Sequence, residues 1–225
     1  MVLFAGIVLA CAGPTPGSTI ETLAVDVSRA PAEGTWTSVP LGSSQPLNNG
    51  DRISTAQQGE GLLKLPCAWL RVFRDTELRF QEISVDGANL AGAKGAALVD
   101  AKCKLIKVYN DSTPPEAVIQ THGTKFLVAL DRARHIALLW TLDGTASLTN
   151  LQSDGRLDLT VTVLTGQWSV VRGRNAPEPA RPVSEMGGIL DEMNLWDVYD
   201  KVIAILPSPR AATRTPTATP SRTPT

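Results

Sequence analysis

Strict alternation of apolar and polar residues is the feature that most constrains the fold of this chain. The clearest case is RLDLTVTV at 156–163, where Leu157, Leu159, Val161 and Val163 alternate with Asp158, Thr160 and Thr162. A period of two is that of a β-strand with one buried face. We therefore predict that the four apolar side chains share the buried face of a strand in an antiparallel sheet, sandwich or roll.

The same period recurs between residues 20 and 171. It places on one face Phe126, Val128 and Leu130 of TKFLVAL, Ile136, Leu138 and Trp140 of HIALLW, and Leu78 and Phe80 of TELRF. Turn-forming pairs lie between the runs: Asn49-Gly50, Arg74-Asp75, Asp86-Gly87, Asp143-Gly144 and Asp154-Gly155. About a dozen short strands with few helices predict an all-β domain over 18–175, either a roll or β-helix-like coil or a sandwich. We interpret the glycine-rich stretch 86–97 as a loop or close-packed turn.

One segment departs from the period of two. Residues 187–206 place apolar side chains at helical spacing, with acidic residues between them: Ile189, Met193, Trp196, Tyr199, Ile203 and Leu206, against Asp191, Glu192, Asp197 and Asp200. This pattern predicts one amphipathic helix within 185–206. We expect it to pack on the β domain; the alternative is a docking helix for a partner.

The amino terminus resembles an export signal. Val2–Ala10 is apolar and is followed by small residues, and the run is too short to span a bilayer, which takes ~20 residues. Val8–Cys11 also resembles a bacterial lipobox, in which Cys11 would be acylated. We therefore expect a leader and spacer over 1–17; the alternative is a buried hydrophobic strand.

Export would leave Cys67 and Cys103 as an even pair in an oxidising compartment. A disulfide between them is then expected, and two small buried thiols are the alternative. The cysteine spacing fits no zinc pattern, and the chain has two histidines. We expect no metal and no cofactor.

Composition narrows the class of partner. Hydrophobic residues make up 43% of the 225, which fits a folded protein. The net charge is -1, so the protein as a whole has no positive electrostatic field that would attract nucleic acid. Residues 207–225 are rich in Thr and Pro, with three Arg and no acid. We expect this tail to be a disordered linker or stalk, or else a frayed terminus.

Little in the sequence points to catalysis. His122 and His135 lie outside any nucleophile motif, and the acidic residues of 187–206 fall on the solvent face of the expected helix. Trp36, Trp69, Trp140 and Trp168 are better candidates for function, because rings on a sheet can stack on sugars or apolar ligands. Trp140 lies on an apolar face and is expected in the core. We expect no catalytic residue.

Four motifs follow one another along the chain. They are Gly50-Asp51-Arg52-Ile53-Ser54-Thr55 with Gly59 before LLKL; Thr76-Glu77-Leu78; Gly123-Thr124-Lys125-Phe126-Leu127-Val128 with Asp143-Gly144 after it; and LTGQWSVVRG at 164–173. In this order they resemble the FecR-type domain, an extracytoplasmic all-β module, over about residues 35–173. The resemblance implies that Gly50 and Asp51 are turn residues of a binding scaffold.

The resemblance also sets the functional expectation. Signalling FecR-type proteins carry a cytoplasmic segment and a transmembrane helix, which this sequence lacks room for, so we expect an exported module rather than an anti-sigma factor. It would act as an envelope sensor, adaptor or scaffold that binds a protein or glycan and meets the membrane only through its lipid anchor. The alternatives are a small carbohydrate-binding or carbohydrate-active protein that uses exposed Trp and carboxylates, and the FecR-like part of a larger protein.

Overall fold

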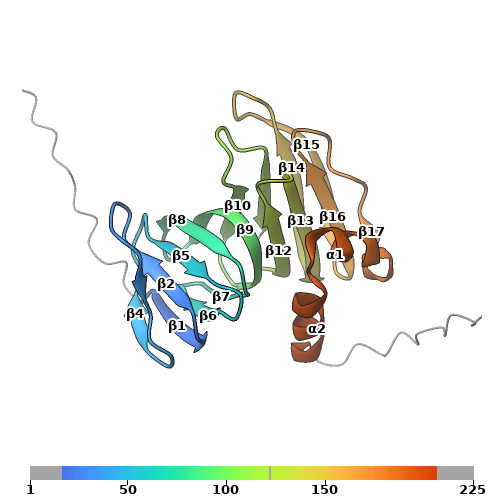
Figure 1. Cartoon of the computed structure of the whole chain (residues 1–225). Helices are drawn as coiled ribbons and strands as arrows, with labels where there is room; N and C mark the ends of the chain where they lie inside the picture. Colours follow the sequence, from blue (N-terminus) through green and yellow to red (C-terminus); the bar gives the residue numbers. More distant parts are fainter. Residues whose placement is uncertain (1–16, 122, 207–225) are drawn as a thin grey trace, which may run out of the picture.

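The computed structural model describes residues 17–121 and 123–206 (Figure 1). Three predictions lie outside these residues: acylation of Cys11 within the leader, the role of His122, and the tail at 207–225. Within the described chain the protein is built mostly of β-strands, which confirms the all-β prediction. No helix of the described residues is long and apolar enough to cross a membrane.

The strands form two layers that share one long strand, β9 (Gly87–Ala101). The first sheet has the order β3 (Thr37–Ser38), β2 (Val27–Ala30), β5 (Arg52–Thr55), β8 (Glu77–Ile83), β9, β10 (Leu105–Asn110), β11 (Ala117–Thr121), β14 (Thr145–Leu151) and β15 (Leu157–Leu164). The second has the order β4 (Ser44–Pro46), β1 (Thr19–Ala24), β6 (Glu60–Lys64), β7 (Ala68–Val72), β9, β12 (Lys125–Asp131), β13 (Ile136–Asp143), β16 (Gln167–Arg172) and β17 (Arg181–Pro182). Only β9 and β10 pair in parallel among these ladders. The result is a sandwich.

Strand β9 corrects the prediction of a loop at 86–97. Its first half pairs with β8 and β10 and its second half with β12 and β7, so the strand passes from one sheet into the other (Figure 1). Small residues are needed at this passage because neighbours approach on every side. A Cβ at Gly92 would overlap a methyl of Leu130, and Gly95 has φ +90 against the backbone of Thr76. The glycines therefore mark a tight crossing inside a strand.

The main core lies between the two sheets. Leu78 and Phe80 of β8 face Phe126, Val128 and Leu130 of β12 within it, which confirms the faces predicted for these strands. A second core lies on the outer side of the second sheet and contains Ile136, Leu138 and Trp140. The strands of this region are thus buried on both faces.

The outer strand β15 departs from the prediction. Val163 is buried, but Leu157 and Leu159 are 58% and 55% exposed. Among the described strands β15 pairs only with β14, so it lies at the margin of the first sheet. The alternation gives the strand correctly, but it does not show that the first half of its apolar face extends beyond the core.

The carboxyl-terminal segment forms a short 3₁₀ turn, η1 (Val183–Glu185), and two helices, α1 (Gly187–Met193) and α2 (Trp196–Ile205). The prediction of one helix is wrong in this respect. Asn194 adopts a left-handed conformation (φ 53), and its N–H donates to the carbonyls of Leu190 and Asp191. Asparagine tolerates this conformation well, so it ends α1 and redirects the chain.

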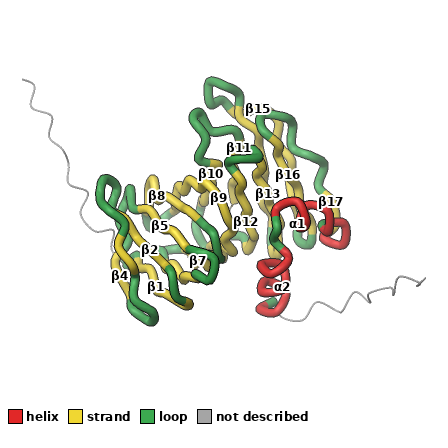
Figure 2. The backbone as a smooth tube through the Cα atoms, viewed as in Figure 1, coloured by secondary structure: helices red, strands yellow, loops and turns green. Residues whose placement is uncertain are grey.

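Both helices lie on the outer side of the second sheet (Figure 2). Tyr199 of α2 stacks on Trp140 of β13, with ring centroids 5.3 Å apart. Charged pairs hold the junction between the two helices. Arg74 binds Asp197 at 2.6 Å, and Arg172 binds both oxygens of Glu192 at 2.6 and 2.7 Å. These hydrogen bonds hold the pKa of the Asp197 and Glu192 carboxyls below their ordinary values.

Candidate ligand-binding surface

The first FecR-like motif serves the framework. Gly50 has φ +87, and Asp51 is buried with one carboxylate oxygen that accepts from the backbone N–H of Asn48 at 2.8 Å and pairs with Arg29 at 2.7 Å. Ile53 belongs to the main core. Asp51 is therefore more than a turn residue, because it also ties the turn to β2.

The other motif residues are architectural as well. The Thr55 hydroxyl donates to the Phe73 carbonyl at 2.5 Å and accepts from the N–H of Thr76 at 2.9 Å, and a Cβ at Gly59 would meet the Asp26 carbonyl at 2.6 Å. The Thr124 hydroxyl donates to the Thr145 carbonyl at 2.8 Å. The remaining members form turns or β-structure: Gly123 and Gly144 have positive φ, Phe126 and Val128 are in the core, and Asp143 ends β13. The motifs build strands and turns, and they form no reactive cluster.

The candidate acid–base groups are dispersed or engaged. His135 has φ 57 and lies 3.0 Å from both oxygens of Glu116. Asp191 accepts from the Trp196 indole N–H at 2.6 Å, while Asp197 and Glu192 bind arginines. No group of three or more His, Cys, Asp or Glu within the described ranges is placed to hold a metal ion.

The four tryptophans singled out from the sequence divide into two pairs. Trp140 and Trp168 are buried under the helices in the second core, which confirms the core prediction for Trp140. Trp36 and Trp69 are 42% and 59% exposed. Trp36 stacks on the Arg52 guanidinium, 5.1 Å from its centre, whereas Trp69 lines a pocket.

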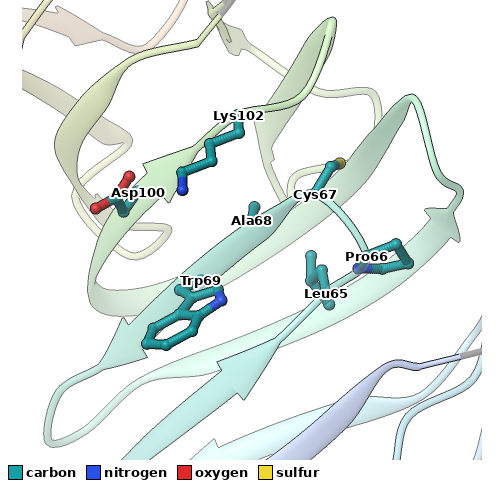
Figure 3. A pocket seen from close by; sticks show the side chains of 7 residues that line it. All are labelled: Leu65, Pro66, Cys67, Ala68, Trp69, Asp100 and Lys102. Atoms are coloured by element: carbon teal, nitrogen blue, oxygen red, sulfur yellow. The ribbon is translucent and has the colours of Figure 1, made fainter.

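The pocket at Trp69 has a volume of about 490 Å³ and lies where β7 and the end of β9 meet the β6–β7 turn (Figure 3). It is lined by Leu65, Pro66, Cys67, Ala68, Trp69, Asp100 and Lys102. Trp69 and Asp100 are direct cross-strand partners. Their neighbours Ala68, Leu70 and Val99 point into the main core, so the alternation turns Trp69 and Asp100 outward.

A disulfide braces this pocket. Cys67 and Cys103 are bonded, with Cα atoms 4.9 Å apart, and the N–H of Lys102 donates to the Cys67 carbonyl at 2.8 Å. The β6–β7 turn is therefore joined to the chain that follows β9. The lining residues from both segments are held in place together.

Charged groups surround the Trp69 ring. The Lys64 ammonium lies 5.9 Å from the ring centroid, and Asp100 pairs with Lys125 at 3.5 Å. Figure 3 shows the Lys102 side chain extending from the end of β9 on the same side as Asp100. An exposed ring with donors and an acceptor beside it can stack on a ligand and hydrogen-bond its periphery.

The same lining argues against hydrolysis at this position. Cleavage of a glycosidic bond takes two carboxyl groups facing one another, and Asp100 is the one acid in the lining. The arrangement suits recognition. Sequence reasoning selected Trp69 but missed Lys64, Asp100 and Lys102, because their proximity depends on the register of β6, β7 and β9.

Comparisons with known proteins add little detail. No family model matches the sequence, and no curated protein matches it. Two crystal structures of a protein described as a putative anti-sigma factor from Parabacteroides distasonis ATCC 8503 are similar, each with a TM-score of 0.47 and 15% identity. Each alignment covers 58% of this chain and 59% of that protein. A likeness this distant does not assign a function.

Proposed function

We propose that this protein is a non-catalytic, exported binding module of the cell envelope that acts as a sensor, adaptor or scaffold. One observation carries the proposal: Trp69 is a large aromatic side chain, 59% exposed, on a braced sheet beside a pocket of about 490 Å³. Burying so much apolar ring surface in a complex is favourable, and large exposed rings mark binding surfaces.

Two features support export. The sequence begins with an apolar stretch that resembles an export leader and reaches a lipobox-like Cys11, and the Cys67–Cys103 bond is of a kind that persists in oxidising compartments. The order of motifs, which resembles a FecR-type domain, fits the same setting. The lipid on Cys11 would tether the module to a membrane surface.

A glycan is the second candidate for what the module binds, and the pairing of Trp69 with Asp100 favours it. The apolar face of a pyranose can stack on the indole, while sugar hydroxyls donate to the carboxylate and accept from Lys102. A protein ligand would use the same ring as an anchor, without need of the carboxylate.

The test is an NMR titration of the full chain with a panel of soluble oligosaccharides. A glycan ligand should shift the Trp69 indole resonance, and Trp69→Ala and Asp100→Asn should each weaken binding ~10-fold or more. Trp196→Ala removes an exposed tryptophan of α2 and should leave binding unchanged. Binding that is insensitive to both pocket variants would contradict the assignment of this surface.

A protein partner calls for a different readout. A photo-crosslinking residue at position 69 should capture one discrete envelope protein in the bacterial host, whereas the same residue at position 196 should not. Intact mass and membrane fractionation test the export claim separately. A mature chain that begins at acylated Cys11 would support it, and a soluble chain that retains Met1 would refute it.

A further inference from the structure

Two arginines lie directly opposite one another on the outer face of the first sheet. Arg52 of β5 and Arg79 of β8 are cross-strand partners. Ile53, Leu78 and Phe80 beside them point into the main core, so both guanidinium groups project outward. Like charges placed directly across a strand pair are destabilising, so this placement needs a physical reason.

The charge of these arginines is not balanced by an ion pair. Arg29, Arg71, Arg74 and Arg172 each pair with a carboxylate, but no ion pair between described residues involves Arg52 or Arg79. Glu77 and Asp111 line the same hollow without reaching either guanidinium at ion-pair distance. Neither guanidinium is therefore engaged by a carboxylate of the described chain.

Arg52 is also held in a fixed position. Its guanidinium lies 5.1 Å from the centre of the Trp36 ring and donates one N–H to the Gly34 carbonyl at 3.1 Å. Its Nε is shielded from solvent and has no hydrogen-bond partner within the described chain. A shielded N–H donor without an acceptor carries a desolvation cost.

The two arginines border a small hollow of about 170 Å³, whose other walls are Glu77, Leu78, Ala91, Ala93 and Asp111. Ala91 is the cross-strand partner of Arg79 on β9, and its short side chain leaves space beside the guanidinium. Space and two guanidinium groups that form no ion pair with a carboxylate of the described chain thus coincide at one place.

We propose that Arg52 and Arg79 form a binding site for a small oxyanion: a carboxylate, phosphate or sulfate group. Guanidinium groups bind such anions through paired, charge-assisted hydrogen bonds, and a bound anion would offset the repulsion between the arginines. The carboxylates of Glu77 and Asp111 also line the hollow, and they would accept hydrogen bonds from a molecule that carries hydroxyl donors next to its anionic group. The site is on the opposite sheet from the Trp69 pocket and is independent of it.

The test is an NMR titration of the full chain with inorganic phosphate, sulfate and glucuronate, with glucose as the uncharged counterpart. The Arg52 and Arg79 side-chain N–H resonances should shift with saturation for at least one anion. Arg79→Gln should weaken that binding ~10-fold or more, and Arg79→Lys should weaken it less. Arg156→Gln makes the same change of charge at an exposed position just before β15 and should leave binding within about twofold. The preferred anion distinguishes a free phosphate or sulfate from an acidic sugar.

Stability supplies a second readout. Without anion, Arg79→Gln should keep or raise the Tm, because it removes a like-charge contact. Three results would overturn the proposal: no saturable shift with any anion, equal binding by Arg79→Gln and Arg156→Gln, or a fall in the Tm of Arg79→Gln in the absence of anion. The last would show that the pair stabilises the sheet by itself.

Discussion

Arg74 binds both carboxylate oxygens of Asp197, at 2.6 and 2.9 Å, although the two residues are 123 positions apart. Arg74 lies just after β7, and Asp197 lies in the first turn of α2. The same guanidinium donates to the Asn194 carbonyl at 3.1 Å, beside the break between the helices. One side chain thus fixes both the start of α2 and the end of α1 against the sheet.

Loss of this clamp should loosen the helices. We expect Asp197→Asn to lower the free energy of unfolding by about 1 kcal/mol, since a two-point ion pair at a partly exposed site is lost. Urea unfolding followed by near-UV circular dichroism would report the Trp140–Tyr199 stack. Asp200→Asn, at an exposed position of the same helix, is the matched control and should change stability little. Equal effects of the two variants would show that the Arg74–Asp197 pair does not contribute to the free energy of unfolding.

Acid should act on the same contacts. Asp197 and Glu192 have pKa values below their ordinary ones, so the folded state holds fewer protons than the unfolded chain near pH 4. Their contribution is complete above the unfolded pKa values, about 4, and is lost as pH falls through the lower folded values. The protection of the α1 and α2 amides, measured relative to their intrinsic exchange rates, should therefore fall below pH 4, ahead of that of β12 and β13. In Asp197→Asn this acid sensitivity should be reduced; an unchanged profile would assign the effect to other groups.

Reduction of the disulfide should destabilise the whole sandwich. Cys67 and Cys103 are 36 positions apart, and a bond that closes a loop of this length contributes roughly 2–4 kcal/mol. Urea unfolding with and without reductant measures the difference. The Cys67→Ser/Cys103→Ser double variant should resemble the reduced protein, and Cys11→Ser should respond to reductant as the parent chain does. A parent protein indifferent to reductant would contradict the expectation.

Gly95 should resist substitution far more than a surface glycine. It combines φ +90 with contact against the Thr76 backbone, so we expect Gly95→Ala to cost at least ~3 kcal/mol. Gly155 has φ +80 but nothing within 4 Å, and Gly155→Ala should cost only about 1 kcal/mol. Thermal unfolding of the two variants side by side separates steric overlap from backbone strain. Similar losses would mean that the crossing of β9 tolerates a side chain.

Local pattern was sufficient to predict much of this fold. Alternation identified β8, β12 and β13 with their buried faces, because each lies inside the sandwich. It failed where neighbours decide the outcome. The exposure of Leu157 depends on the position of β15 at the margin of the first sheet. Residues 86–97 are extended because strands β8 and β10 pair with them on both edges. The break at Asn194 is a single-residue event within a continuous helical period.

The candidate sites show the same division. Trp69 and Trp140 both lie in runs that the sequence predicts to be strands. Only the alternation of apolar residues around Trp140 distinguished it as a core residue. Asp100, Lys102 and the pair Arg52–Arg79 come together only through strand register, which no local pattern contains. The structural roles of the motif residues could be predicted in part from the sequence. A glycine at a turn is predictable, whereas the buried ion pair between Asp51 and Arg29 is not.

The sharing of β9 by two sheets has a consequence for how the molecule is made. Strands β7 and β8 are synthesised before β9, while β10 and β12 follow it, so neither sheet is continuous until this strand has been joined on both edges. Such pairings between distant segments slow the search for the native state and leave strand edges open in the meantime. A nascent chain that ends before residue 131 should therefore depend on chaperones, or should collapse only after β12 has been synthesised. The completed protein should unfold as one cooperative unit.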